Sequence, residues 1–496
     1  MKLKAIFFTI ISLLTILTFV GCHRSNGVIY AIDAKDTSCS YIEQTITIKY
    51  NLHESFDSTN VAFSATADVD WVTAIDASTF GQLEVTIEEN NGENRTATIT
   101  ISAPGCQNKK IELLQYSIPP EKANHTLMFC FFGTSLSRYF KTNLEDAATA
   151  IETGILGNNN RVVFFRQEGK NSGYIGELYI DSQECVEKRL QDITLTSSII
   201  TPEKIGELIA TMAAYAPAER YGIVFAGHGQ GWITREILTN NQDVATLSAG
   251  YNPWIPAIGA EVTRAFGESN VQVNMNELAS GIEHSQIELD YILFDACFMS
   301  NIESIYDLRY SANYIIASPC EIMGKGFPYH RTLPYLFKDF GVMTDYEGAA
   351  ESYYKFYKDE YQGNQRCGSI AVYDCSQIDA LAAATKELVR NAKTKYDTEH
   401  LQTYEGQDPH HFYDFGQWGK VVATDKDLRN KFIAQLDNTI IAKFSLDRFY
   451  SAYGNYGTYP IELGVYTGVT TSAPSTAYPN GWRQTNWYKD VIALEN

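Results

Sequence analysis

The chain has 496 residues, of which 45% are hydrophobic and 20% charged, enough for two globular domains with separate cores. Its formal net charge of −20 argues against nucleic-acid binding, because that function needs a basic surface to contact phosphates. The charge alone excludes no other class of function.

The N-terminus has the features of an export signal. A basic start precedes an apolar stretch, 5–20, which is too short for a comfortable membrane span. The next residues, Phe-Val-Gly-Cys at 19–22, resemble the lipobox of bacterial lipoproteins, in which the cysteine is lipidated. We therefore expect a lipoprotein signal peptide at 1–22, lipidation at Cys22 and a tether at 23–27. An ordinary secretion signal is the alternative.

The resemblance to lipoproteins implies an exported protein anchored by lipid to the bacterial cell envelope, with the outer membrane as the expected site. Its periplasmic or surface orientation stays open. The other eight cysteines form no CxxC pair and no array with metal-ligand spacing. An exported enzyme with a free catalytic thiol needs a reducing or anaerobic setting.

Residues 28–118 have the pattern of a small all-β domain. Apolar and polar residues alternate between closely spaced turn residues, and helical periodicity is absent. The pattern predicts a β-sandwich with strands that include 45–50, 83–87 and 97–101.

Three features of this domain resemble the BACON domains found in gut Bacteroidetes. They are Trp71, a turn followed by an arginine at 90–95, and a closing strand that ends at Gln115. The resemblance implies glycan or mucin binding through residues 28–118. A spacer that holds the next domain away from the membrane is the alternative, and Trp71 suits either a core anchor or a sugar platform.

A linker at 119–124 separates this domain from 125–496, because its paired prolines can continue neither a strand nor a helix. The second domain alternates apolar strands with helices, which predicts a mostly parallel sheet covered on both faces. The expected strands are 126–132, 161–166, 173–180, 221–226, 291–294 and 314–318, and the expected helices are 143–151, 201–214, 275–283 and 302–308.

Two of these strands end in residues that can perform chemistry. His228 follows 221–226 between two glycines, and Cys297 follows 291–294 in an Asp-Ala-Cys segment. The carboxyl ends of parallel strands meet at one edge of a sheet, so we expect the imidazole and the thiol side by side. A thiol with an adjacent base predicts a cysteine hydrolase. A turn histidine and a buried structural thiol are the alternative.

The segments Phe-Ala-Gly-His-Gly around His228 and Phe-Asp-Ala-Cys-Phe-Met-Ser around Cys297 resemble the clostripain family of cysteine peptidases, related to caspases, gingipains and legumain. The resemblance covers residues 125–495 and implies a caspase-like α/β/α sandwich. It implies Cys297 as nucleophile and His228 as general acid and base. The backbone N–H groups of Gly229 and Cys297 would form the oxyanion hole.

The same resemblance implies an acidic pocket for a basic substrate side chain. Asp295 would line this pocket, and Glu321 is a second candidate. The implied substrates are proteins or peptides cut after Arg or Lys, and neither acid distinguishes these two residues. A structural carboxylate is the alternative for Asp295.

Relatives with this layout often cut themselves after a basic residue between the histidine and the cysteine. Arg235 and Arg264 lie in that interval. No cofactor or metal is expected. Some relatives use calcium, yet the chain has no EF-hand-like run of acids, and His410 and His411 have no third ligand at sensible spacing.

The sequence therefore predicts a lipid-anchored cysteine endopeptidase that cleaves after basic residues. The alternative from another class is a catalytically inactive glycan- or host-binding surface lipoprotein. A third hypothesis is a caspase-like processing factor that acts only on a partner protein.

Overall fold

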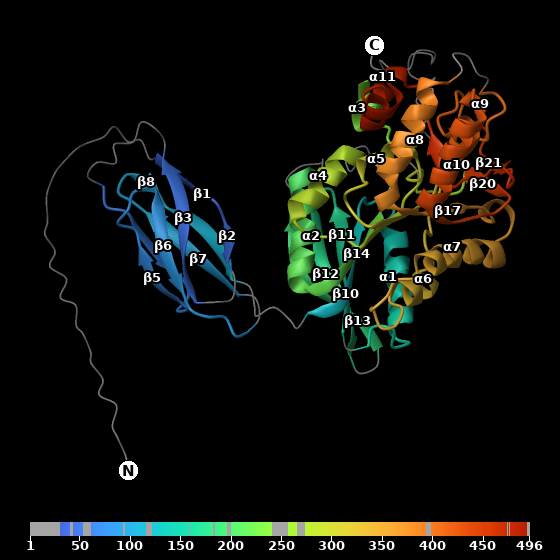
Figure 1. The fold of residues 1–496 in the computed structure, drawn as a ribbon. Coiled ribbons are helices and arrows are strands. Elements are labelled where there is room, and N and C mark those ends of the chain that lie inside the picture. The colour runs from blue at the N-terminus through green and yellow to red at the C-terminus, as the bar shows by residue number, and fades with distance from the viewer. Residues whose placement is uncertain are drawn as a thin grey trace, which may run out of the picture. The chain divides into compact units, whose positions relative to one another are not determined.

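The structure, a computed structural model, divides into two compact units, Met1–Ile118 and Pro119–Asn496 (Figure 1). The residues it describes are 30–39, 43–52, 61–92, 95–115, 122–157, 159–181, 184–195, 200–240, 256–264, 273–392, 398–473, 475 and 477–493. The predicted signal peptide, the tether and Cys22 lie outside them. None of the helices in these ranges is long and apolar enough to cross a membrane.

The first unit is a β-sandwich of two sheets, with strand orders β5-β6-β3-β1-β8 and β2-β9-β7-β4. Alternate residues of each strand face the core between the sheets, as Leu83, Val85 and Ile87 do. The strands are β1 (Tyr30–Ala34), β2 (Thr37–Cys39), β3 (Gln44–Leu52), β4 (Ser64–Ala67), β5 (Val72–Asp76), β6 (Gln82–Ile87), β7 (Arg95–Ser102), β8 (Cys106–Gln107) and β9 (Lys109–Gln115).

Trp71 belongs to the core of this sandwich. Its side chain is buried among the apolar residues of both sheets. The guanidinium of Arg95 lies 4.4 Å from the centre of the indole ring, a cation–π contact that covers the ring. Trp71 is therefore a core anchor, and its ring offers no open platform for a sugar.

The second unit is built on a nine-stranded sheet with strand order β13-β12-β11-β10-β14-β15-β16-β17-β19. The five central strands, β11 to β16 in this order, are parallel, and the outer strands at both edges are antiparallel. The strands are β10 (Ala123–Phe131), β11 (Asn160–Gly169), β12 (Ser172–Asp181), β13 (Glu184–Thr194), β14 (Ala218–Ala226), β15 (Tyr291–Asp295), β16 (Tyr314–Ala317), β17 (Ser369–Asp374) and β19 (Ile440–Ser445).

Helices cover both faces of this sheet, which confirms the predicted α/β/α sandwich (Figure 1). Helices α2 (Pro202–Tyr215) and α4 (Met275–Ser285) pack together on one face, and α1 (Ser137–Ile151), α6 (Tyr329–Leu336) and α7 (Tyr346–Glu360) on the other. The remaining elements are α3 (Arg235–Asn240), α5 (Ile302–Asp307), α8 (Ile378–Arg390), β18 (Tyr413–Asp414), α9 (Phe415–Val422), α10 (Lys426–Thr439), β20 (Arg448–Ser451), β21 (Gly457–Pro460), β22 (Thr470–Thr471), α11 (Pro479–Trp482) and short turns at Gly363–Gln365, Cys375–Gln377 and Tyr488–Ile492.

Local signals account for most helix ends. The Thr201 side chain accepts a hydrogen bond from the N–H of Lys204, and Pro202 opens α2 as predicted. Helix α1 begins at Ser137, six residues before the predicted start, because Phe140 adds another buried turn.

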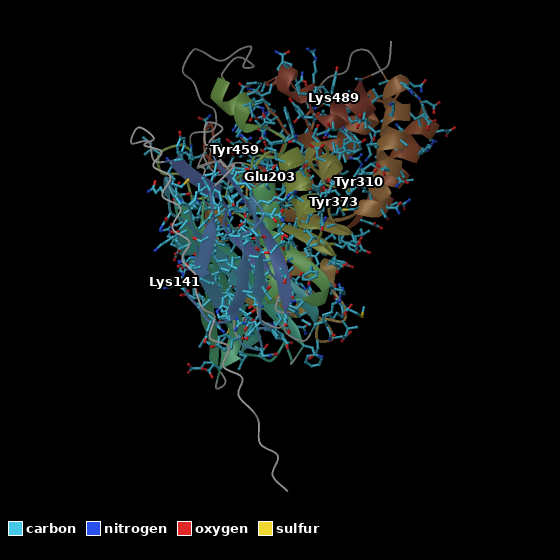
Figure 2. The ribbon with its side chains drawn as sticks, turned by 90° about the vertical axis from the view of Figure 1, so that its left-hand side faces the viewer. Lys141, Glu203, Tyr310, Tyr373, Tyr459 and Lys489 are labelled. Carbon is cyan, nitrogen blue, oxygen red and sulfur yellow. The ribbon has the colours of Figure 1, made fainter. Side chains whose placement is uncertain are left out.

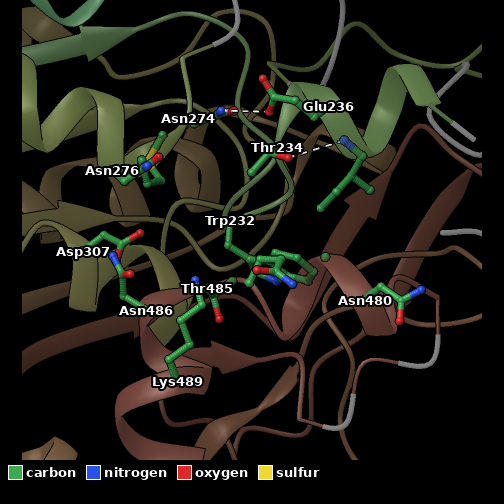
Figure 3. A pocket seen from close by; sticks show the side chains of 14 residues that line it. Trp232, Thr234, Glu236, Asn274, Asn276, Asp307, Asn480, Thr485, Asn486 and Lys489 are labelled. Carbon is green, nitrogen blue, oxygen red and sulfur yellow. Dashed lines mark hydrogen bonds between the residues drawn. The ribbon is translucent and has the colours of Figure 1, made fainter. Parts of the chain in front are cut away.

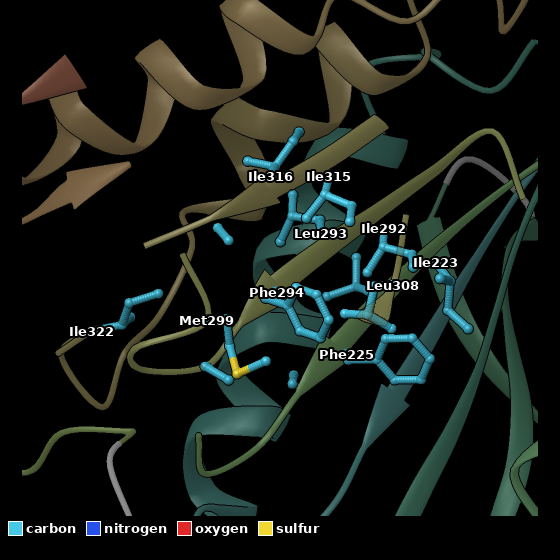
Figure 4. Packing of buried hydrophobic residues seen from close by; sticks show 14 of the residues in the cluster. Ile223, Phe225, Ile292, Leu293, Phe294, Met299, Leu308, Ile315, Ile316 and Ile322 are labelled. Carbon is cyan, nitrogen blue, oxygen red and sulfur yellow. The ribbon is translucent and has the colours of Figure 1, made fainter. Parts of the chain in front are cut away.

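The central strands are buried on both faces, which explains their uninterrupted apolar sequences (Figure 4). Phe225 of β14 and Phe294 of β15 stack with ring centres 5.9 Å apart. Met299 and Ile322 extend this core beyond the ends of the strands, beneath the loops that carry the candidate site.

Two side chains labelled in Figure 2 have opposite environments in this unit. Lys141 on α1 pairs with Glu145 at 3.7 Å in solvent, a contact that contributes little to stability. Tyr373 on β17 is buried, where it contacts the hydroxyl of Ser300 and donates to the carbonyl of Gly468 at 3.2 Å. These bonds fix the loop that follows Cys297.

The buried sheet centre predicts a large cost for truncation. We expect Leu293→Ala, on β15, to lower the free energy of unfolding by about 2–5 kcal/mol, because the cavity lies in close-packed core. The matched control Ile441→Ala, on half-exposed β19, is expected to cost less than about 1 kcal/mol. Thermal and urea unfolding of the purified chain measure both, and equal losses would contradict this view of the core.

Candidate active site

His228 and Cys297 both follow strands that end at the same edge of the central sheet. They follow β14 and β15, which are paired in parallel up to Ala226 and Asp295. The N–H of Gly227 donates to the carbonyl of Asp295 at 3.4 Å, continuing the pairing beyond the strands. The fold therefore brings the two predicted strand ends together.

His228 is half-buried and has a neighbour that sequence reasoning missed. Its Nε2 lies 2.8 Å from the hydroxyl oxygen of Ser135. Ser135 follows β10, which pairs with β14 on the side away from β15, so its loop reaches the same sheet edge. A polar residue after a third adjacent strand was the signal available in the sequence.

The thiol of Cys297 is fully buried in the described state. The N–H of Ile322 donates to its Sγ at 3.0 Å. Burial raises the pKa of the Cys297 thiol well above its usual value, and the nearby Glu321 carboxylate adds to the rise. Phe298 then turns the chain with φ of 59°, a left-handed conformation that is strained for a bulky residue.

Arg264 fills a closed pocket beside Cys297. Its guanidinium Nη1 lies 2.9 Å from Oδ2 of Asp295 and donates to the carbonyl of Asp295 at 3.2 Å. Nη2 donates to Oδ1 of Asn143 at 2.6 Å and to the carbonyl of Lys325 at 3.2 Å, and Nε donates to the carbonyl of Gly324 at 3.1 Å. These contacts match the five N–H groups of a guanidinium in number.

Two further hydrogen bonds fix the Asp295 carboxylate beside the Arg264 guanidinium. Its Oδ2 also accepts hydrogen bonds from the Tyr329 hydroxyl at 2.7 Å and from the N–H of Phe327 at 3.3 Å. Complete burial raises the pKa of the Asp295 carboxyl, while the Arg264 guanidinium and these two donors oppose the rise. Gly326, at φ +73°, leaves the space open, because a Cβ there would lie 2.3 Å from Nη2 of Arg264.

The backbone around Arg264 lies like an added strand. Its N–H donates to the carbonyl of Ile322 at 2.8 Å, and the N–H of Gly324 donates to the carbonyl of Val262 at 2.7 Å. Thr263 and Met323 complete this pairing as an antiparallel bridge. Extended peptides bind to exposed strand edges with this hydrogen-bond pattern.

The carbonyl oxygen of Arg264 is hydrogen-bonded to the two backbone N–H groups that we predicted for the oxyanion hole. It accepts hydrogen bonds from the N–H of Gly229 at 2.9 Å and from the N–H of Cys297 at 3.3 Å. The guanidinium of Arg264 is therefore fixed against Asp295, and its carbonyl oxygen is fixed against the N–H groups of Gly229 and Cys297.

Glu321 lies beside the residue that precedes Arg264. Its Oε2 accepts a hydrogen bond from the Thr263 hydroxyl at 2.7 Å, and its Oε1 accepts one from the N–H of Ala452 at 3.0 Å. Burial raises the pKa of the Glu321 carboxyl to about 7. The sequence analysis named Glu321 as a second candidate for the acidic pocket, but none of the hydrogen bonds of the Arg264 guanidinium described above involves Glu321.

Arg235, the other basic residue considered for self-cleavage, has a structural environment. It forms a two-point ion pair with Glu277 at 2.7 and 2.5 Å and lies 3.0 Å from the Glu236 carboxylate. These contacts fix the start of α3 against α4.

His410 and His411 belong to a loop organised by a buried carboxylate. His410 Nδ1 lies 3.2 Å from Glu405, which raises the pKa of His410. His411 is buried and stacks on Tyr478. Within the described ranges, no group of three or more His, Cys, Asp or Glu residues has the arrangement of a metal site.

A separate pocket of about 600 Å³ lies beside Trp232, between α3 and the C-terminal segment (Figure 3). Asn274 donates to the Glu236 carboxylate at 3.0 Å on one side of it, and Asn486 donates to Asp307 at 2.9 Å on the other. Its lining includes neither His228 nor Cys297, so it is distinct from the candidate active site.

Two family models match parts of this chain. The family model described as the clostripain family, Peptidase C11, matches residues 252–467. The chain belongs to the clostripain family. A second model, the BACON putative binding domain, matches residues 61–112 of the sandwich. No curated protein matches this clostripain-family chain.

Two solved structures of C11 proteases share the fold. The chain is 28% identical to a secreted C11 cysteine protease of Bacteroides thetaiotaomicron called iotapain, with a TM-score of 0.65 over 75% of this chain and 100% of that one. It is 26% identical to an inactive zymogen C11 protease of Parabacteroides distasonis, with a TM-score of 0.62 over 76% and 100%. The clostripain-family chain is therefore a cysteine peptidase.

A third structure shows the fold alone. It is a secreted C11 cysteine protease of Bacteroides thetaiotaomicron in complex with an irreversible peptide inhibitor, 23% identical with a TM-score of 0.59 over 74% of this chain and 99% of that one.

The contacts of Gly326 predict that a single methyl group expels Arg264 from its pocket. In a Cys297→Ala background, which removes the thiol, we expect Gly326→Ala to speed trypsin cleavage after Arg264 at least ~10-fold, because about 1.4 kcal/mol of lost binding changes the released fraction tenfold. Digestion kinetics followed by mass spectrometry provide the measurement.

Gly363→Ala is the matched control, because Gly363 also has a positive φ of +59° but its Cβ would meet nothing within 4 Å. Equal cleavage in the two variants would mean that backbone strain, and not the filled pocket, releases Arg264.

Proposed function

We propose that this peptidase is an exported endopeptidase that cleaves proteins on the carboxyl side of arginine, and that its own Arg264–Ala265 bond is its first substrate. The pose of Arg264 carries this proposal. The side chain makes five polar contacts in a closed acidic pocket, while the carbonyl oxygen faces the backbone N–H groups of Gly229 and Cys297.

The roles of the catalytic groups follow from this pose. His228 accepts the proton of the Cys297 thiol, and the resulting thiolate attacks the carbonyl carbon of the arginine, while the Gly229 and Cys297 N–H groups stabilise the oxyanion. His228 protonates the departing amine as the C–N bond breaks and a thioester forms. A water molecule, deprotonated by His228, then hydrolyses the thioester and restores the thiol. Ser135 orients the imidazole through Nε2.

The described state is then a resting state. The segment 262–264 occupies the substrate position, and the burial of Cys297 raises the pKa of its thiol. Release of this segment would admit water and substrate and would lower that pKa. The likeness to an inactive zymogen C11 protease supports this reading.

The pocket also favours arginine over lysine. Asn143 and Gly324 contact Nη2 and Nε of Arg264, at two different positions on the guanidinium. A single ammonium placed against Asp295 cannot make both contacts, because it is a compact point charge. The Asp295 carboxylate would thus attract either cationic side chain, and the acceptors on Asn143 and Gly324 would favour arginine over lysine.

Export is supported by the N-terminal signal and by the likeness to secreted proteases. We propose that lipid on Cys22 anchors the chain to the outer membrane and that the sandwich serves as a spacer. Because Arg95 covers the Trp71 ring, glycan binding by the sandwich would need another surface.

Self-cleavage is expected at one bond. Purified wild-type chain, incubated under reducing conditions, should yield a fragment that begins at Ala265, detected by intact mass and N-terminal sequencing. Cys297→Ala should stay intact, because the nucleophile is missing, and Arg264→Ala should not be cut at this position.

Arg235→Ala is the matched control, since Arg235 lies in the same interval but pairs with Glu277, and it should be cut like the wild type. A cut after Arg235, or a cut in Cys297→Ala, would contradict the assignment.

Peptide substrates should show the arginine preference directly. We expect kcat/KM for peptides ending in Arg before a fluorophore to exceed that for Lys by about 10–100-fold, since each lost hydrogen bond to a charged group costs about 1.5–3 kcal/mol before an ammonium forms compensating contacts. Peptides ending in Asn or Asp should not be cut.

Asn143→Ala should narrow the Arg-to-Lys ratio, whereas Asn480→Ala, in the separate pocket beside Trp232, should leave it unchanged. If wild-type kcat/KM were equal for Arg and Lys peptides, or higher for Lys, the proposed role of Asn143 and Gly324 in selecting arginine would be wrong.

A further inference from the structure

Beside the arginine pocket lies a second polar contact with the bound segment. The Thr263 hydroxyl, almost fully buried, donates to Oε2 of Glu321 at 2.7 Å. We propose that Glu321 selects substrates with a hydroxyl residue, threonine or serine, immediately before the cleaved arginine. This inference rests on the proposed function, because it takes Thr263 as the residue that precedes the scissile arginine.

Glu321 is held so that one of its oxygens faces the bound chain. The carboxylate is 1% exposed, and the Ala452 N–H donates to Oε1 at 3.0 Å and to Oε2 at 3.2 Å. The Ser451 hydroxyl also bonds to this carboxyl. The bound segment contributes the Thr263 hydroxyl, so the hydrogen bonding of the buried carboxyl depends on what binds there.

An apolar residue in place of Thr263 is penalised by this arrangement. Valine has nearly the shape of threonine but would present a methyl group to Oε2 of Glu321. Oε2 would lose its shorter hydrogen bond and keep only the one from the Ala452 N–H at 3.2 Å. The loss of a hydrogen bond at a buried carboxyl is costly, so a site that binds a hydroxyl disfavours the analogue that lacks it.

A long basic residue is also disfavoured. The Thr263 hydroxyl reaches Glu321 at direct hydrogen-bond distance from a side chain with a single carbon between Cα and the oxygen. Around this contact, Cys320, Tyr453 and Ser451 are all buried. A lysine side chain would extend several bonds beyond the position of the carboxylate.

The preceding position is different. The side chain of Val262 is 48% exposed, and the contact described there is the backbone bond from Gly324. This position should accept many residues. Selection on the amino-terminal side of the cut is therefore concentrated at the arginine and at the hydroxyl residue before it.

The catalytic test uses the full-length wild-type chain after self-cleavage and a peptide series that ends in Arg before a fluorophore. The residue before Arg is Thr, Ser, Val, Ala or Lys. We expect kcat/KM for Thr and Ser to exceed that for Val by about 10–100-fold. In Glu321→Leu, the Thr-to-Val ratio should fall to about one or below, because the acceptor is absent.

The ratio separates recognition from general damage, since a merely structural role would lower kcat/KM for Thr and Val equally. Asn143→Ala, in the arginine pocket, is the control and should keep the wild-type ratio. Equal rates for Thr and Val in the wild type overturn the proposal. Fastest cleavage of the Lys peptide also overturns it, since Glu321 would then pair with a cation.

A second measurement needs no catalysis. In the Cys297→Ala background, Thr263→Val should speed trypsin cleavage after Arg264, while Thr263→Ser should keep it slow. Equal rates for the two variants would overturn the proposal even if no peptide were cut. Cleavage after Arg regardless of the preceding residue would defeat this inference alone, whereas no cleavage of any Arg peptide would defeat the proposed function.

Discussion

The arrangement of the site depends on the ion pair between Arg264 and Asp295. Both side chains are fully buried, so each charge has lost its water and depends on the other. Such a pair is stable only when its polar atoms have partners, and here the five guanidinium contacts and the two extra donors to Oδ2 of Asp295 supply most of them, while Oδ1 of Asp295 has no hydrogen-bond partner among the described residues. The pair therefore fixes where the Arg264 backbone lies.

One loop after β16 connects the parts of the site. The N–H of Ile322 contacts the Cys297 thiol while its carbonyl holds the N–H of Arg264. Farther along, the Gly324 carbonyl meets the guanidinium, and Phe327 supports Asp295. Binding of a chain along this loop thus acts on the acidic pocket and on the surroundings of the thiol together.

Burial has opposite consequences for binding and for reactivity here. It strengthens the bonds between the bound segment and the pocket, because no water competes for them. It also raises the pKa of the Cys297 thiol, which favours its protonated form. Under the proposed function, segment 262–264 would therefore hold the enzyme in a resting state.

Much of the fold could be predicted from local patterns. Strands buried on both faces need uninterrupted apolar runs, so β14 and β15 were visible in the sequence, and so were the polar residues that follow them, His228 and Cys297. The helix cap at Thr201 could also be predicted, because its hydrogen bond joins residues only three positions apart. The sequence analysis did not predict β17 and β19, although β17 has a similar buried apolar run at 370–373. The antiparallel direction of these two strands has no local signal.

The sequence by itself determined the two apolar strands that lead to the site, the candidate dyad of His228 and Cys297 that follows them, and the acid Asp295 beside it. Only the tertiary structure decided that Arg264 fills the pocket, that Asn143 and Ser135 belong to the site, and that Glu321 faces Thr263. These contacts join residues 31 to 121 positions apart, so no local periodicity encodes them. They arise because parallel strands bring distant loops to one edge of the sheet.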